Sequence, residues 1–204
     1  MATQGNLIIL SAPSGAGKTS LARALIEATP NTEMSVSHTT RSCRKGETEG
    51  VDYHFVSTAE FLDMVEQDQF LEHAKVYDHY YGTSHKAVAD KLDQGVNVLL
   101  DVDWQGARIV KKLMSDAISV SILPPSLAEL EKRLKIRARD PDEVIKKRMA
   151  QAIAEMSHCR EAEHIILNDD FAAALQDLQH IMQRQFDQVR KLSIDVDSLL
   201  TTEY

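Results

Sequence analysis

Apolar runs of strand length recur along this chain, separated by longer stretches in which apolar and polar residues mix. The runs cover residues 7–10, 96–103, 117–123 and 165–168. Between them, apolar positions recur three and four residues apart, which is the period of a helix with one buried face. Strands that alternate with helices predict right-handed crossovers and an α/β fold, in which a parallel sheet is covered on both faces.

Capping residues place the expected helices more closely. These helices should begin near residue 18, after Thr58, after Ser84, at 104, after Ser126, at 142 and at 171, and the last should continue to 192. Residues 37–56 have a different texture, because they are polar and rich in turn residues. We therefore expect this stretch, with short strands at 51–56 and 70–76, to leave the alternating core.

The stretch between the first strand and the first helix carries the clearest chemistry. Its residues are Ala12, Pro13, Ser14, Gly15, Ala16, Gly17, Lys18, Thr19 and Ser20. A glycine-rich turn between a buried strand and a helix N-terminus holds polyphosphate through inward-pointing backbone N–H groups. We expect Lys18 to reach the outer phosphates and the Thr19 hydroxyl to ligate Mg²⁺.

One position departs from the motif G-x-x-x-x-G-K-[ST], because Ala12 stands where the motif has glycine. Pro13 follows it, and a residue before proline is pushed into the extended region, where alanine fits as well as glycine. Gly15 and Gly17 remain where the backbone must turn and approach phosphate. An ordinary strand-to-helix turn is the competing interpretation, and the register of strand, lysine and helix disfavours it.

The second long apolar strand ends in two acidic residues, Asp101 and Asp103. At the carboxyl end of a parallel strand, Asp101 can reach Mg²⁺ through water beside the phosphate loop. A carboxylate that caps the next helix is the alternative. Further along, basic residues gather between Lys132 and Arg148 on two expected helices. They form either a solvated face or a set of guanidinium groups that close over a transferring phosphate.

Composition and charge limit the class of protein. The chain has 204 residues, which suits one core, and 43% of them are hydrophobic. A net charge of -8 argues against nucleic acid as the main partner. Cys43 and Cys159 lack metal-ligand spacing, so we expect neither a disulfide framework nor a zinc site. With no recognisable signal peptide or bilayer-spanning run, we expect a cytoplasmic protein without a membrane partner.

Six stretches together resemble the guanylate kinase family, of the monofunctional bacterial type, over essentially the whole chain. They are residues 11–18, 37–41, 80–83, 100–106, 122–126 and 168–170. The resemblance implies a P-loop core of residues 1–36, 90–125 and 158–204, a GMP-binding insertion of residues 37–89 and a helical lid of residues 126–157. It also implies phosphorylation of GMP, and of dGMP, by ATP with Mg²⁺ as cofactor.

The resemblance carries site residues over as well. For GMP they are Ser37, Arg41, Arg44, Glu47, Tyr53, Glu72, Tyr81, Thr83 and Asp103. For ATP they are the loop residues 12–20 together with Asn168, which falls where the family approaches the adenine. Catalytic roles fall on Lys18, Arg41, Arg137 and Arg148, with Arg133 a weaker candidate. Since residues 136–139, Ile-Arg-Ala-Arg, replace a Gly-Arg-Gly-like turn of the family, Arg137 and Arg139 are alternatives for one lid arginine.

The chemistry of these side chains supports the same roles. Guanine presents two adjacent donors, N1–H and the 2-amino group, and an ionised Glu72 can accept both. Adenine offers an acceptor there, so we expect such a site to reject it by about 10⁴-fold. Ser37 and Thr83 suit the O6 and N7 edge of guanine. The arginines and tyrosines of the insertion suit a monophosphate.

Other classes fit parts of the sequence. A guanylate-kinase-like module without catalysis would bind a phosphopeptide through the same arginines, but such modules usually have a degraded phosphate loop. A regulatory GTPase should carry an Asn-Lys-x-Asp motif after a late strand, and this sequence has none. A kinase for another small acceptor is a third possibility. The apolar stripe of the last helix is either core or the interface of a homo-oligomer.

Overall fold

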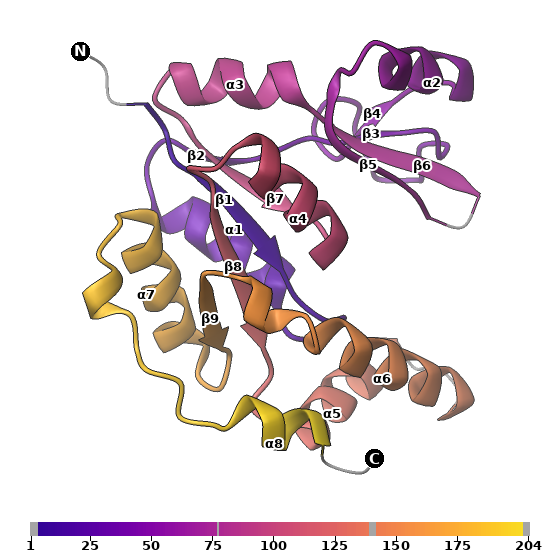
Figure 1. The fold of residues 1–204 in the computed structure, drawn as a ribbon. Helices are drawn as coiled ribbons and strands as arrows, with labels where there is room; N and C mark the ends of the chain where they lie inside the picture. Colours follow the sequence, from indigo (N-terminus) through magenta and orange to yellow (C-terminus); the bar gives the residue numbers. More distant parts are fainter. Residues whose placement is uncertain (1–3, 77, 139–141, 202–204) are drawn as a thin grey trace.

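The computed structural model describes residues 4–76, 78–138 and 142–201, which form two sheets and the helices around them (Figure 1). The strands are β1 Leu7–Ser11, β2 Thr32–Met34, β3 His38–Thr39, β4 His54–Phe55, β5 Phe70–Val76, β6 His79–Ser84, β7 Asn97–Asp101, β8 Ile118–Leu123 and β9 His164–Leu167. The α-helices are α1 Lys18–Ala28, α2 Thr58–Glu66, α3 His85–Asp93, α4 Trp104–Leu113, α5 Leu127–Ala138, α6 Asp142–Met156, α7 Phe171–Met182 and α8 Val196–Thr201. Short 3-10 turns lie at Cys159–Glu161 and Phe186–Gln188.

The larger sheet has five strands in the order β2-β7-β1-β8-β9, and each neighbouring pair is parallel. β1 lies at its centre, and all six residues of β8 are buried. Ligand sites in such sheets lie outside the carboxyl ends of the strands. The α/β fold expected from the alternation of strands and helices is therefore confirmed.

Both faces of this sheet are covered, because alternate residues of a strand point to opposite sides. Ile8 and Leu10 belong to a buried cluster with residues of α1 and α7. Leu7 and Ile9 belong to a second cluster with residues of α3 and α4. Burial on both faces explains why β1 reads as a continuous apolar run rather than an alternating one.

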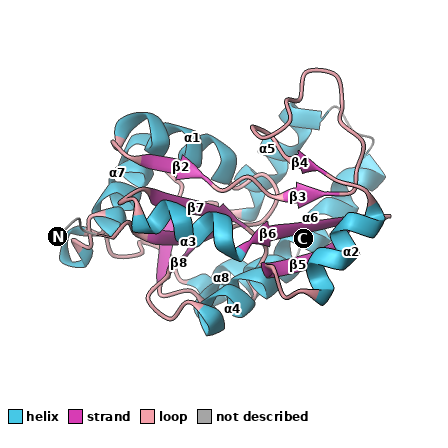
Figure 2. Cartoon of the chain, turned by 90° about the horizontal axis from the view of Figure 1, so that it is seen from above, coloured by secondary structure: helices cyan, strands magenta, loops and turns pink. Residues whose placement is uncertain are grey.

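A second sheet, in the order β4-β3-β6-β5, lies beside the first (Figure 2). β5 and β6 form an antiparallel hairpin, of which the sequence predicted only the first strand, at 70–76. Aromatic rings supply its core, since Phe61 stacks on Phe70 at 4.6 Å and on Tyr80 at 5.4 Å between ring centroids. The short strands within the polar residues 37–56, β3 and β4, thus belong to this second sheet and not to the larger one.

Helices α5 and α6 share a third buried cluster with α8 and the ends of β8 and β9. α8 was not expected, and its Val196 and Leu199 complete this cluster. The last long helix ends at Met182 rather than at 192, because the chain turns at Arg184, which has a φ of 56°. Within the described ranges, no helix is long and apolar enough to cross a bilayer.

Local caps account for the starts of several helices. Ser126 and Ser84 cap α5 and α3 as expected, through hydrogen bonds from backbone N–H groups three residues on. The cap of α2 is Ser57 rather than Thr58, because Ser57 and Glu60 bond each other's backbone N–H in a capping box.

Candidate active site

The phosphate loop runs from the end of β1 to the start of α1 and has the backbone that its sequence demands. Gly15 and Gly17 adopt φ values of 92° and 99°, a region that side chains disfavour. Ala12 is not among the described residues with positive φ, so alanine costs nothing there. The Ala16 N–H donates to the Pro13 carbonyl at 3.1 Å and closes the turn. The loop is therefore a preformed cradle for an anion.

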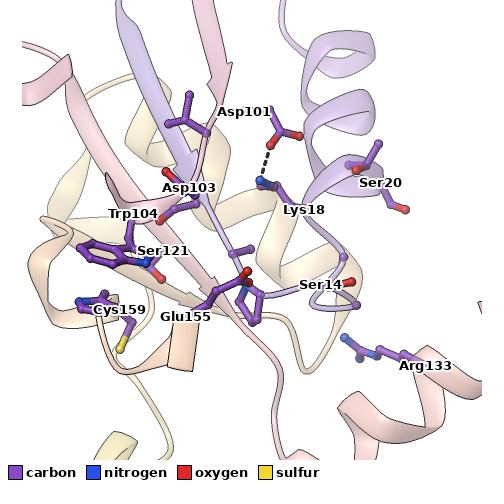
Figure 3. Close-up of a pocket in the computed structure, with 18 of the residues that line it drawn as sticks. Ser14, Lys18, Ser20, Asp101, Asp103, Trp104, Ser121, Arg133, Glu155 and Cys159 are labelled. Carbon is purple, nitrogen blue, oxygen red and sulfur yellow. Dashed lines mark ion pairs between the residues drawn. The ribbon is translucent and has the colours of Figure 1, made fainter. Parts of the chain in front are cut away.

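Lys18 and Asp101 form an ion pair across the carboxyl edge of the sheet (Figure 3). Their meeting follows from the parallel register, in which Leu10 of β1 lies opposite Asp101 of β7. Asp101 therefore does not cap α4. That role belongs to Asp103, which accepts the Gly106 N–H at 2.8 Å. Of the two aspartates at this strand end, Asp101 thus pairs with Lys18 and Asp103 caps α4.

A cavity of about 730 Å³ opens over the loop. Its lining comes from the carboxyl ends of β1, β7 and β8, from α1 and α5, and from the end of α6. The residues are Ser11, Ala12, Pro13, Ser14, Gly15, Gly17, Lys18, Thr19, Ser20, Arg23, Asp101, Val102, Asp103, Trp104, Ser121, Arg133, Glu155, His158 and Cys159. Most of the loop residues expected at ATP thus meet in one cavity.

Asn168 is buried beneath the loop, with 5% of its surface exposed. Its amide Nδ2 donates to the Ala16 carbonyl at 2.7 Å, and its backbone N–H donates to the Leu123 carbonyl. A Cβ on Gly17 would lie 2.3 Å from that Nδ2, so glycine is required there. Asn168 supports the loop from below, and its contact with adenine stays a prediction.

Replacing Asn168 by alanine should lower the free energy of unfolding by about 1–3 kcal/mol, because the buried Ala16 carbonyl loses its partner. Urea unfolding at neutral pH measures this change, and ATP titration of the folded variant should show weaker binding. Asn168→Asp is the matched variant, since its carboxylate would face the carbonyl with no donor. Unchanged stability in both variants would contradict this role.

Helix α6 reaches the phosphate loop through two side chains that lie seven residues, or two turns, apart. Arg148 Nη2 donates to Ser14 Oγ at 2.9 Å. The Glu155 carboxylate interacts with the backbone N–H of the same serine, and Figure 3 shows it pointing toward the loop. Loss of solvent around that carboxylate raises the pKa of Glu155, while Lys18 opposes the rise. Helix α6 therefore contacts the phosphate loop at Ser14.

Of the other arginines predicted on the lid, the structure describes the side chain of Arg133 only. Arg133 lines the cavity and donates to the Asn168 carbonyl at 3.1 Å and to Glu129 at 3.0 Å. The side chain of Arg137 and all of Arg139 lie outside the described part of the chain. The choice between these two arginines stays open.

Glu72 on β5 is the carboxylate expected to read guanine, and the structure gives it a hydroxyl neighbour. Thr83 Oγ1 donates to Glu72 Oε1 at 2.7 Å. Ser37 Oγ lies 3.4 Å from the same Thr83 oxygen and acts as the donor, because the Thr83 proton is already directed at Glu72. Burial raises the pKa of Glu72, and the nearby charge of Asp103 adds to the rise. Hydrogen bonds thus link the three side chains that are predicted to contact guanine.

Gly106 lies at the start of α4, close to these hydrogen-bonded side chains. A Cβ at Gly106 would lie 3.4 Å from Glu72 Oε2, 3.4 Å from Asp103 Oδ1 and 3.1 Å from Val102 Cβ. A side chain there would be tight against Val102, and the start of α4 lies close to the Glu72 carboxylate. Asp103 is the GMP-site residue predicted on the core, and it consequently lies beside Glu72, one of those predicted on the insertion.

Arg41 is the most strongly held of the expected phosphate ligands, with 8% of its surface exposed. Its guanidinium donates to both Glu47 oxygens, at 2.7 and 3.0 Å, and this pairing raises its pKa. The nearby Tyr81 side chain also raises the pKa of Arg41. The rings of Tyr53 and Phe55 lie 5.4 and 5.9 Å from its central carbon. Arg41 is thus oriented before any substrate arrives.

Glu47 and Arg44 shape the same loop. One Glu47 oxygen also accepts the Arg44 backbone N–H at 2.8 Å, and these bonds lower the pKa of Glu47. Its carboxylate therefore holds Arg41, and direct contact with GMP stays a prediction. The Arg44 side chain is exposed. Tyr53 packs edge-on against Tyr81 at 5.9 Å, and burial raises its pKa.

Sequence reasoning missed three residues of the cavity that come from the end of α6 and the turn after it: Glu155, His158 and Cys159. A signal for the first was present, because Glu155 follows Arg148 by seven residues and so lies on the same helical face. Nothing in the sequence marked the other two. Their place follows from the packing of this segment against β8 and α4.

The fold combines a central parallel sheet that carries a phosphate loop and its lysine with a second sheet that carries Arg41 and the hydrogen-bonded Glu72, Thr83 and Ser37. These features define a P-loop nucleotide kinase. The sequence model of guanylate kinase matches residues 4–185. The guanylate kinase of Pseudoalteromonas translucida (strain TAC 125) is 51% identical over 200 residues, which are 98% of this chain and 97% of that protein. That of Escherichia coli (strain K12) is 53% identical over 184 residues, 89% of each.

Solved structures agree. The crystal structure of guanylate kinase from Anaplasma phagocytophilum superposes with a TM-score of 0.70 at 35% sequence identity, over 90% of this chain and 87% of that one. This chain belongs to the guanylate kinase family.

Proposed function

We propose that this guanylate kinase binds ATP on the phosphate loop and GMP on the four-stranded sheet, and transfers a phosphoryl group between them. The observation that carries the proposal is the shared strand end of β7. There Asp101 pairs with Lys18 of the donor site, and Asp103, two residues later, lies beside Glu72 of the acceptor site. Two substrate sites that meet at one strand end suit direct transfer. The enzyme thus phosphorylates GMP at the expense of ATP.

In the donor site, the amides of residues 12–20 and the ammonium of Lys18 would hold the ATP phosphates. When phosphate binds, Lys18 would exchange Asp101 for the outer phosphate oxygens, since both partners are anionic. Asn168 would keep the loop in shape, and its contact with adenine remains part of the proposal. The loop should hold ATP rather than GTP, because the guanine-reading side chains lie on the other sheet.

In the acceptor site, Glu72 would accept the two guanine donors while Ser37 and Thr83 face the O6 and N7 edge. Arg41 and Tyr81, which lie near each other, would bind the GMP phosphate with Arg44 and Tyr53. None of the residues assigned above is assigned to the 2′-hydroxyl, so we propose dGMP as a second acceptor.

Phosphoryl transfer itself needs positioning and charge neutralisation more than proton transfer. The phosphate of GMP has a second pKa near ~6 and is mostly dianionic at neutral pH, so we assign no general base. Arg148, which already touches Ser14 on the loop, is placed to neutralise the transferring group. We propose the same role for Arg137, with Arg139 as the alternative.

Mg²⁺ fits the residues at this site. Thr19 and Asp101 offer oxygen ligands, the kind that Mg²⁺ prefers, with Asp101 acting through water. Among the described residues, no three His, Cys, Asp or Glu side chains gather into a metal cage. This agrees with an ion held largely by substrate phosphates and water. Bound there, Mg²⁺ would neutralise charge on the ATP phosphates.

The experiment that tests the proposal follows ADP formation by the purified protein with Mg-ATP and, in turn, GMP, dGMP, AMP, UMP and CMP. We expect turnover with GMP and dGMP, and rates with AMP about 10⁴-fold lower in kcat/KM. Absence of turnover with GMP would refute the proposed reaction. Equal rates with GMP and AMP would refute only the proposed role of Glu72 in selecting guanine, and not the reaction.

A non-catalytic module that binds a phosphopeptide is the other function that the sequence allowed. No observation favours it, because the loop glycines, Lys18 and Asp101, which such modules usually lose, are all present. Turnover with GMP in the same assay separates the two.

The remaining proposals concern organisation. We keep the division into core (1–36, 90–125 and 158–204), GMP-binding insertion (37–89) and lid (126–157). We infer a cytoplasmic location because both cysteines, exposed Cys43 and buried Cys159, are free. The apolar stripe of α7, with Leu178 and Ile181, is core rather than interface. Formation of a homo-oligomer stays a prediction that light scattering can test.

A further inference from the structure

Trp104, the first residue of α4, stacks on His158 in the turn that follows α6. The ring centroids lie 3.6 Å apart and the planes differ by 10°. The guanidinium carbon of Arg108, one turn further along α4, lies 4.4 Å from the Trp104 ring centroid. Arg108 also forms an ion pair with Glu161 through two guanidinium nitrogens. Glu161 in turn is hydrogen-bonded to His158 Nδ1 at 2.8 Å. Four side chains thus tie α4 to the end of the lid.

At one end, this cluster adjoins the acceptor site. Trp104 directly follows Asp103, whose carboxylate caps α4 through the Gly106 N–H. The position of Gly106 is in turn close to the Glu72 carboxylate, because a Cβ at Gly106 would lie 3.4 Å from Glu72 Oε2. A nucleotide bound to Glu72 would therefore brace the first turn of α4, which carries Trp104.

At the other end, the cluster adjoins the donor site. His158 follows α6 by two residues, and α6 carries Arg148, which bonds the Ser14 hydroxyl of the phosphate loop. Glu155, three residues before His158, interacts with the backbone N–H of the same serine. Any displacement of His158 relative to Trp104 would therefore change how the lid helix rests on the loop.

The location of the pair distinguishes it from ordinary core packing. Trp104 and His158 both line the 730 Å³ cavity over the phosphate loop, and both also line a neighbouring cavity of about 270 Å³. They form a wall between two cavities rather than part of a buried cluster. Such a wall can respond to what the larger cavity holds.

We propose that the Trp104–His158 stack is a positioning pair that couples the GMP site to the lid helix. With GMP bound, the braced start of α4 fixes the stack, and the stack fixes the end of α6, so that Arg148 lies over the phosphate loop. Neither side chain touches a reacting atom. The inference rests on the proposed roles of Glu72 and Arg148 and adds a link between them.

The test measures the affinity for GMP with and without a non-hydrolysable imido analogue of ATP and Mg²⁺. In the unmodified enzyme each ligand should tighten the other by about 5-fold or more. In His158→Ala this mutual tightening should vanish and kcat should fall, while GMP alone binds within about 2-fold of the unmodified enzyme. His158→Phe, which keeps a flat ring, should restore the coupling.

His164→Ala is the matched control. His164 also stacks on an aromatic ring, that of Phe186 at 4.7 Å, but it lies on β9 away from both proposed sites. This variant should keep the coupling. The single tryptophan of the chain reports the stack directly, so its fluorescence should change in His158→Ala and not in His164→Ala.

Three results would overturn the inference. The first is that GMP and the ATP analogue still tighten each other fully in His158→Ala. The second is that His164→Ala loses this mutual tightening equally, and the third is that tryptophan fluorescence is the same in His158→Ala as in the unmodified enzyme. Each leaves the reaction itself intact, because the unmodified enzyme still turns GMP over. Failure of the unmodified enzyme to phosphorylate GMP would instead overturn the proposed function.

Discussion

Lys18→Met is expected to abolish phosphoryl transfer while GMP still binds. The ammonium of Lys18 pairs with Asp101 at the mouth of the phosphate loop, where the outer phosphates of ATP would lie. Methionine keeps the length of the side chain but removes the charge that would stabilise the transferring group. Loss of one such contact lowers kcat by about 10²–10³ or more. Steady-state kinetics with Mg-ATP and GMP measure this loss.

GMP affinity, measured by calorimetry, should change little in Lys18→Met, because the acceptor residues lie on the other sheet. Lys86→Met is the matched control. Lys86 is an exposed lysine that pairs with Asp90 on α3, away from both sites, and its loss should leave kcat unchanged. Loss of GMP binding in Lys18→Met would show that Lys18 has been assigned to the wrong substrate.

Glu72→Gln is expected to remove most of the preference for guanine. The amide can still accept from Thr83, but its NH₂ would face the donors of guanine instead of accepting them. We expect kcat/KM for GMP to fall by about 10²–10³ and the roughly 10⁴-fold discrimination against AMP to shrink correspondingly. Parallel assays with GMP and AMP give both numbers.

The pH dependence supplies a second measure of Glu72. Burial raises its pKa, and only the ionised form accepts both guanine donors, so GMP affinity should fall as the pH drops through that raised pKa. Glu72→Gln should lose this dependence, and comparison over the same pH range cancels the titration of the GMP phosphate. Glu66→Gln, an exposed position on α2, is the control. Unaltered discrimination in Glu72→Gln would refute the specificity argument.

Much of the core followed from local patterns. The continuous apolar runs predicted β1, β7, β8 and β9, since parallel strands buried on both faces leave no room for alternation. The phosphate loop was visible because its backbone demands glycine at fixed positions, and Gly15 and Gly17 adopt the positive φ expected of them. The family resemblance rested on these same short stretches.

Other parts depended on pairing between distant residues. The hairpin strand β6 contains Tyr80, Gly82 and Thr83, whose local signal is that of a turn, and only its pairing with β5 and β3 makes it a strand. The last long helix was predicted ten residues too long, because nothing local shows that Arg190 is held by the buried Asp177.

By itself the sequence determined the α/β core, the phosphate loop and the identity of the side chains that suit ATP and GMP. These are properties of short stretches, in which burial, glycine conformation and charge act within a few residues. The tertiary structure decided which side chains act on one another. It placed Asn168 under the loop, Asp101 on Lys18, Asp103 beside Glu72, and His158 on Trp104. Those contacts depend on strand register and helix packing between residues up to 152 positions apart.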